Sequence, residues 1–186
     1  MIWAKYLDSR NEIRILGIIE ERLQRKIPLL DSQVKWNDFG VFLHNKAITG
    51  FGFYSQQLNV LPNEIWALKN LEVLNFVNCG LNELSTKIGS LISLKELYIG
   101  GNQLTVIPKS IETLNNLQIL YILEDNLFSI PEVIGNLRNL NELVLSSKFV
   151  KKLPHSIIQL TSNTCSVYLN NQEVMIPDST DKKRNH

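Results

Sequence analysis

Large apolar residues recur along residues 45–160 in a pattern that repeats every 23 positions. The five copies begin at Asn45, Leu68, Leu91, Leu114 and Leu137. Each follows the template L-x-x-L-x-x-L-x-L-x-x-N-x-L-x-x-L-P-x-x-I-x-x, and among its seven large apolar positions in all five copies Asn45 alone departs. A fixed period of this length predicts stacked structural units that share one continuous core.

One copy, residues 114–136, shows what each unit should form. Leu120 and Ile122 alternate with Tyr121 and Leu123, which is the pattern of a β-strand. Pro131 then suits the first turn of a short helical segment, because its fixed φ and missing N–H are tolerated there. The unit is therefore a strand, a tight turn and a short helical return, and stacking predicts an α/β solenoid with a parallel sheet.

The stretch L-K-E-L-Y-I-G-G-N-Q-L-T-V-I-P-K-S-I-E-T, residues 94–113, resembles the leucine-rich repeat family. It is similar to the 23-residue intracellular class of Ras-suppressor-like and Scribble/Erbin-like proteins, and the resemblance covers residues 45–160. It implies a horseshoe with a parallel concave sheet and short helical or 3-10 segments on the convex side. It also implies a protein-binding role, with small GTPases or their regulators as candidate partners.

Several positions depart from this template. The twelfth position, usually Asn, is occupied in turn by Gln56, Cys79, Asn102, Asp125 and Lys148. Lys148 offers no acceptor, so we expect it to disturb the turn before Val150. Ser85 replaces the proline of the second copy. A sixth, degenerate copy predicts a C-terminal capping repeat at residues 161–177, followed by a polar tail at 178–186 that favours a natural end of the chain.

Residues 1–44 do not follow the repeat and predict an N-terminal cap. Ser9 and Glu12 have capping-box spacing, which predicts a helix at about residues 10–25 that ends before Pro28. Its apolar stripe is expected to comprise Ile13, Leu16, Ile19, Leu23 and Ile27, interrupted by Glu20, with Ile15 and Ile18 lying off it. The alternative is that residues 8–27 form a partner-binding helix.

A β-hairpin is expected at about residues 33–44, with 34–36 and 41–43 as strands. The run W-N-D-F-G-V-F-L-H-N-K-A-I-T-G resembles the segment that precedes other leucine-rich arrays. We expect Trp36 and Phe39 to cover the first strand edge and the open end of the core.

Composition narrows the class of protein. The chain has 186 residues, of which 44% are hydrophobic, and a net charge of +1, which fits one domain with a sizeable core. The sequence pI of about 7.8 argues against nucleic acid as partner. The chain lacks a signal-peptide core and an apolar run of roughly 18 residues, which argues against a membrane. Two cysteines, without cysteine-rich caps, predict a reducing, cytoplasmic compartment.

Strand residues between the buried leucines should point to the concave face and line up in columns across the repeats. Exposed apolar side chains on such a face favour a binding site, and tyrosines favour interface hot spots. Gly50, Gly52, Gly100 and Gly101 would leave room for a ligand backbone, while Glu96, Glu142 and Glu124 would border the patch. The predicted partner-binding residues are Tyr54, Val77, Glu96, Tyr98, Ile119, Tyr121, Leu123, Glu142 and Val144.

The same apolar residues could serve the concave face in two further ways. Aromatic and β-branched residues stabilise a sheet without any partner. The patch could also be buried between two copies, so the expected state is a monomer or a weak homodimer.

The sequence offers little for catalysis, metal or cofactor binding, and we expect none of the three. His44, His155 and His186 lie far apart, and Cys79 and Cys165 have no histidine or basic cluster close by in the sequence. Glu96 and Glu142 should lie about 10 Å apart, a separation suited to hydrolase carboxylates, but on an open face that does not exclude water. Lys148, Lys151 and Lys152 form a small basic cluster that fits a solvated surface or a contact to an acidic partner.

The sequence thus predicts a non-catalytic protein–protein interaction module that binds a protein or peptide on its concave face. A link to small-GTPase signalling follows from the resemblance alone. The alternative is a recognition or targeting fragment of a larger multidomain signalling enzyme or ubiquitin ligase.

Overall fold

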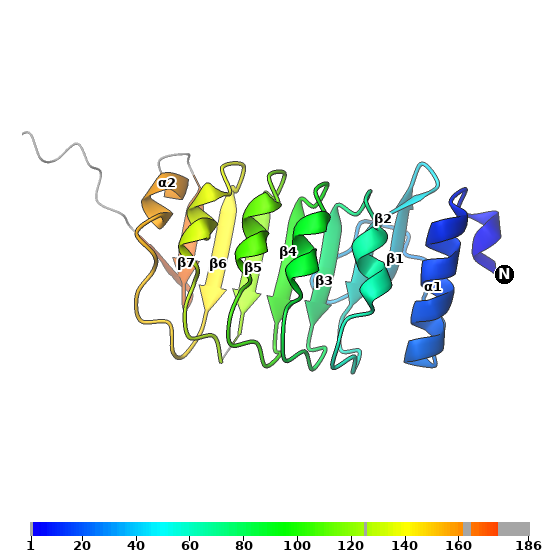
Figure 1. Ribbon diagram of the computed structural model, residues 1–186, viewed down its shortest axis with the longest axis horizontal. Coiled ribbons are helices and arrows are strands. Elements are labelled where there is room, and N and C mark those ends of the chain that lie inside the picture. The colour runs from blue at the N-terminus through cyan, green and yellow to red at the C-terminus, as the bar shows by residue number, and fades with distance from the viewer. Residues whose placement is uncertain (1, 125, 162–164, 175–186) are drawn as a thin grey trace, which may run out of the picture.

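Stacked coils form a solenoid with the strands side by side in one sheet and the short helical turns in a layer in front of it (Figure 1). The computed structural model describes residues 2–124, 126–161 and 165–174. The predicted α/β solenoid is confirmed, and we call the sheet face turned away from the helical turns the concave face.

The described residues form an eight-stranded sheet whose spatial order is the order of the chain. Its strands are β1 (Phe39–His44), β2 (Ala47–Phe53), β3 (Val73–Val77), β4 (Glu96–Gly100), β5 (Ile119–Leu123), β6 (Glu142–Ser146), β7 (Ser166–Leu169) and β8 (Gln172–Glu173). Pairing is parallel from β2 to β7 and antiparallel at the two ends, between β1 and β2 and between β7 and β8. The parallel part is the sheet expected from the repeats.

Short helical turns return the chain between the parallel strands β2 to β7. They are the 3-10 turns η2 (Asn63–Ala67), η3 (Thr86–Ser90), η4 (Lys109–Thr113) and η5 (Glu132–Asn136) and the α-helix α2 (Ile157–Thr161), whereas the 3-10 turn η1 (Ile2–Lys5) and the α-helix α1 (Arg10–Leu23) precede β1. Pro62, Pro108 and Pro131 directly precede η2, η4 and η5. At η3 the Oγ of Ser85 accepts from the Lys87 N–H at 3.2 Å, so a side-chain cap stands where the other turns have proline.

The template leucines and isoleucines lie between the sheet and the helical turns and form one continuous core. At its N-terminal end the rings of Phe51 and Phe53 stack with centroids 4.1 Å apart. Because every coil buries its apolar side chains against the next coil, the core is quasi-one-dimensional and both its ends require covers.

A buried hydrogen-bond ladder joins the turns that follow the strands. The Oδ1 of Asn102 accepts from the Cys79 and Leu81 N–H groups, and its Nδ2 donates to the carbonyls of Phe76 and Gly100. The thiol of Cys79 likewise donates to the Phe53 carbonyl at 3.0 Å. The twelfth template position therefore satisfies backbone groups of neighbouring coils that water cannot reach.

The turn at Lys148 is supported by its neighbours. The Oγ of Ser147 donates to the Leu127 carbonyl at 2.6 Å and accepts from the Phe149 N–H. The Ser147 N–H in turn donates to the Oδ1 of Asn170 at 3.0 Å. Ser147 and Asn170 thus supply acceptors that a lysine side chain lacks, and the expectation that Lys148 disturbs this turn stays a prediction. Asp125 lies outside the described residues.

The N-terminal end of the core is covered by η1 and α1. The Oγ of Ser9 accepts from the Glu12 N–H, as the capping box predicted. The helix ends at Leu23 with Gln24 in the left-handed region (φ 49°), before Pro28 is reached.

The inward face of α1 differs from the predicted stripe. It consists of Glu12, Ile15, Leu16 and Ile19, so Ile15 is inside the core while Ile13 and Leu23 lie at its border. Glu12 can be buried among them since its carboxylate is hydrogen-bonded, with Oε2 accepting from the Ile48 N–H of β2 at 3.1 Å. Since this face packs inward, α1 has no free apolar face for a partner, which argues against the interpretation of residues 8–27 as a partner-binding helix.

The N-terminal hairpin joins β1 to β2, with its turn at Asn45 and Lys46 (φ 49° and 59°). The expected hairpin at residues 33–44 was wrong, since residues 34–36 form no strand and β1 pairs with the first repeat strand. The outer edge of β1 is partly covered where Val41 exchanges hydrogen bonds with Pro28 and Leu30 (3.0 and 2.8 Å). Trp36 does not cover the core end, which is closed by Trp3, Leu7 and α1.

At the C-terminal end, β7 turns through Asn170 and Asn171 into the short β8. This hairpin follows the last parallel pairing, and β8 is the outermost strand among the described residues. The predicted capping repeat falls partly on residues 162–164 and 175–177, and the tail wholly on residues 178–186, all outside the described residues. Among the residues that the structure describes, no helix has the length and apolar character needed to cross a membrane.

Candidate binding surface on the concave face

Parallel pairing brings equivalent strand residues of successive coils into three columns across the concave face. The first contains Gly50, Val73, Glu96, Ile119, Glu142 and Ser166; the second Gly52, Asn75, Tyr98, Tyr121, Val144 and Tyr168; the third Val77, Gly100, Leu123 and Ser146. These side chains alternate with the buried apolar residues, as the pleat of a strand requires.

Residues 31–38, here called the strap, lie over the N-terminal part of the concave face. The Asn75 side chain donates from Nδ2 to the Lys35 carbonyl at 3.0 Å, and the Tyr54 N–H donates to the Asp38 carbonyl at 3.1 Å. Val34 is 2% exposed, and a Cβ added at Gly50 would lie 2.7 Å from its Cγ2. The strap thus rests on β2 and β3.

This contact corrects two expectations about the concave face. The first-column residue Val73 is fully buried instead of exposed. The space above Gly50 and Gly52, expected for a ligand backbone, is filled by the chain itself, because a Cβ at Gly52 would collide with the Asp38 carbonyl. The surface open to a partner therefore begins beyond the strap, at Val77 of β3 and at β4.

A pocket of about 250 Å³ lies between the strap and the open strands. It is lined by Trp36, Val77, Tyr98, Ile99, Gly100, Gly101, Tyr121 and Leu123. Trp36 of the strap is 54% exposed and packs edge-on against the Tyr54 ring at 5.9 Å, so it forms one wall. Leu123 is 40% exposed and lies in the column position next to Gly100. A concave, mostly apolar pocket with a few polar groups is typical of a binding site.

Two tyrosine–carboxylate pairs hold the aromatic part of this surface in place. The Tyr98 hydroxyl donates to Glu96 Oε2 at 2.7 Å and the Tyr121 hydroxyl to Glu142 Oε1 at 2.9 Å. Their rings meet edge to face at 5.3 Å. Burial, then the hydrogen bond to Glu142 and the negative charge of that carboxylate, raise the pKa of Tyr121 to about 12. The same causes, with Glu96 as acceptor, raise the pKa of Tyr98 further. Both hydroxyls therefore stay protonated donors, and the rings are preorganised.

The predicted site residues are placed as follows. Val77, Tyr98, Tyr121 and Leu123 line the pocket. The Tyr54 ring packs edge to face against the Trp36 ring. Glu96, Glu142, Ile119 and Val144 are half-buried in the first and second columns beside it. Whether these residues bind a partner stays a prediction.

Sequence reasoning missed Trp36 as part of the surface and misplaced Glu124. Glu124 is fully buried, and its carboxylate accepts from the N–H and Nδ2 of Asn102, so it belongs to the ladder instead of the rim. The paired glycines at 50 and 52 were the signal for the strap, because they mark a close backbone approach.

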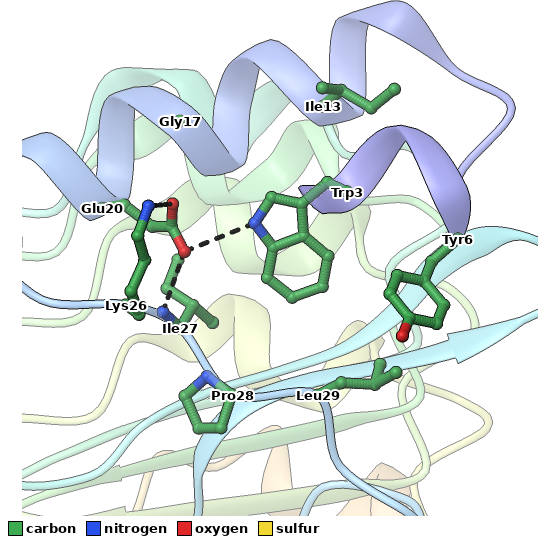
Figure 2. A pocket seen from close by; sticks show the side chains of 9 residues that line it. All are labelled: Trp3, Tyr6, Ile13, Gly17, Glu20, Lys26, Ile27, Pro28 and Leu29. Carbon is green, nitrogen blue, oxygen red and sulfur yellow. Dashed lines mark hydrogen bonds and ion pairs between the residues drawn. The ribbon is translucent and has the colours of Figure 1, made fainter. Parts of the chain in front are cut away.

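A second hollow, of about 420 Å³, lies at the N-terminal end between η1, α1 and residues 26–29 (Figure 2). The Glu20 carboxylate accepts there from Trp3 Nε1 (3.4 Å), Lys26 Nζ (2.9 Å) and the Ile27 N–H (3.1 Å). Glu20, which interrupts the apolar stripe of the helix, therefore fastens residues 26 and 27 to α1. The polar group of this hollow, the Glu20 carboxylate, is therefore used to hold the N-terminal cap together.

Among the described residues, no group of three His, Cys, Asp or Glu side chains is arranged to hold a metal ion. Both cysteines are buried free thiols. Burial raises the pKa of the Cys79 thiol to about 12, and burial together with the Glu142 charge raises that of Cys165 to about 11. Lys151 and Lys152 are exposed on the surface.

Solved structures that are similar to this chain include two leucine-rich repeat proteins. A leucine-rich repeat protein of Leptospira interrogans is 32% identical, with a TM-score of 0.55, over 80% of this chain and 38% of its own. The leucine-rich repeat domain of the type III effector XopL is 26% identical, with a TM-score of 0.44, over 55% of this chain and 43% of its own. The chain thus spans less than half the length of either structure. No family profile and no curated protein matches it.

Proposed function

This chain is a leucine-rich repeat protein, and we propose that it binds a protein or peptide segment on the part of its concave face that the strap leaves open. Repeat scaffolds of this kind present extended binding surfaces as a rule. The proposed role is non-catalytic, and the binding residues are those of the pocket and the two tyrosine–carboxylate pairs.

The observation that carries the proposal is the pocket between Trp36 and Leu123. Both side chains are large, apolar and exposed, while Tyr98 and Tyr121 are fixed by hydrogen bonds before any partner arrives. A rigid aromatic wall lowers the ordering cost of association, and tyrosine and tryptophan are enriched in interface hot spots. Sheet stabilisation alone accounts for the paired tyrosines but not for an exposed Trp36 on a loop.

Selection of displayed random linear peptides on the immobilised chain, followed by affinity measurement, tests the proposal. Leu123→Asp places a charge in the pocket and should weaken the selected peptides at least about tenfold, since a buried charge without a partner is costly. Ile92→Asp, which changes an exposed apolar residue outside the pocket, is the control and should leave binding unchanged. Equal affinities for the wild-type chain and the Leu123 variant would contradict the proposal.

A second copy of the chain, bound through the same surface, is the competing occupant. Sedimentation velocity of the wild-type chain and of Leu123→Asp separates the two cases. A dimer that the substitution dissociates would assign the pocket to a second copy of the chain. A small-GTPase partner, a cytoplasmic location and a place within a larger signalling enzyme or ubiquitin ligase stay predictions.

A further inference from the structure

We infer that the segment bound on the concave face is extended and carries one large apolar side chain and, about four residues away, an arginine or lysine. The apolar side chain fills the pocket beside Trp36, and the basic side chain lies against the carboxylates of Glu96 and Glu142. This inference rests on the proposed function and adds the chemistry of the partner.

The basic side chain follows from the charges on the open strands. Glu96 and Glu142 occupy the same column on either side of Ile119, and each accepts one tyrosine hydroxyl. A carboxylate has acceptor sites on both oxygens, so one hydroxyl leaves capacity for a further donor. Two carboxylates in one column favour a cation between them, and a guanidinium can also stack on the adjacent tyrosine ring.

Among the described residues, no basic residue of the chain forms an ion pair with Glu96 or Glu142. The Nζ of Lys95, at the start of β4, lies 2.9 Å from Glu72 Oε1 in an ion pair. Lys35 of the strap lines a hollow together with Glu96 and Tyr98, but its side chain is exposed, and within the part of the chain that the structure describes it forms no ion pair with Glu96. The complementary charge for Glu96 and Glu142 is therefore assigned to the partner.

The spacing follows from strand geometry. The carboxylate column and the pocket column are represented on β4 by Glu96 and Gly100, four residues apart. At about 3.3 Å per residue this is roughly 13 Å, and an extended partner covers that distance with about four residues whose first and last side chains point to the same side. The intervening side chain on that side would lie over Tyr98 and Tyr121 of the second column.

The strap shows that this face accepts a backbone segment, here one of the chain's own that turns at Trp36 and Asn37. It lies over β2 and β3, with Val34 seated above Gly50 and the Lys35 carbonyl bound by Asn75. On β4 and in the turn after it, Gly100 and Gly101 line the pocket, but the Asn78 side chain occupies the space at Gly101, so the room expected there for a ligand backbone is filled by the chain itself. The partner segment therefore lies beside the strap and contacts it at Trp36.

The selected random peptides described above provide the probe. They should share a large apolar residue and an arginine or lysine at the stated spacing. The double variant Glu96→Gln with Glu142→Gln keeps an oxygen acceptor for each tyrosine hydroxyl and removes both charges, so it should weaken these peptides about tenfold at low salt and much less at high salt. Glu21→Gln with Glu83→Gln removes two exposed charges elsewhere and should leave affinity unchanged.

Three outcomes separate the partner chemistry from the proposed function. Peptides that lose binding with Leu123→Asp but lack basic residues and ignore the double glutamine variant would overturn this inference alone. Peptides indifferent to Leu123→Asp, or a library that yields no binder, would overturn both. A shared basic residue together with sensitivity to both variants would establish the inference.

Discussion

Replacement of Asn102 by alanine tests the buried ladder that fixes the turns between coils. The Asn102 side chain accepts from the N–H groups of Cys79 and Leu81 at 3.0 and 3.2 Å and donates to two backbone carbonyls and to Glu124. Alanine leaves the two N–H groups inside the core without that acceptor. A buried donor without a partner costs about 1–3 kcal/mol, so the two together should lower the free energy of unfolding by about 3 kcal/mol.

Urea unfolding followed by circular dichroism measures this loss. For a chain of this length, about 3 kcal/mol corresponds to a fall in Tm of roughly 6–12 °C. Asn139→Ala is the matched control, because its amide makes one exposed hydrogen bond, from Nδ2 to the Asn115 carbonyl. That variant should lose under about 1 kcal/mol. Equal losses for the two asparagines would refute the view that the ladder satisfies otherwise stranded backbone groups.

Three further predictions concern the strap, the thiols and the tyrosines. Gly52→Ala should cost about 1–3 kcal/mol in urea unfolding because its methyl group displaces the strap, whereas Gly17→Ala, with open space around it, should gain about 0.5–1 kcal/mol from helix propensity. Cys79, with a pKa raised to about 12, should resist iodoacetamide at pH 8 until urea unfolds the chain, and rapid native labelling would contradict its burial. Tyr121 has a folded pKa raised to about 12, so it contributes stability that is present below its usual pKa of 10 and is lost as pH rises toward 12. Because the Tyr121 hydroxyl ionises only in that range, tyrosinate absorbance should differ between wild type and Tyr121→Phe only above about pH 11.

The repeated part of the fold was predictable because its information is local and redundant. Each copy states the same apolar positions, so one departure such as Asn45 does not shift the register. The columns of the concave face follow from that register and the strand pleat alone. The capping box at Ser9 was equally local, since its two partners lie three residues apart.

The strap and the hairpin were not predictable in this way. Alternating side chains at residues 34–36 and 41–43 fit a strand pair, but β1 gains a full-length partner in β2, which a local pattern does not reveal. The strap is held by contacts between residues 34–38 and residues 50–75, which no period links. Only the glycines at 50 and 52 hinted at a close approach, and a bound ligand would account for them as well as the chain's own backbone does.

Because the contacts described for the strap fall on β2 and β3, the length of the array can change without unseating it. A coil duplicated between β5 and β6 would widen the accessible surface by about 4.8 Å and leave the anchored portion untouched. The anchorage of the strap and the coils beyond β5 are thus separable parts, and new specificities can be engineered by adding or exchanging coils downstream of β5.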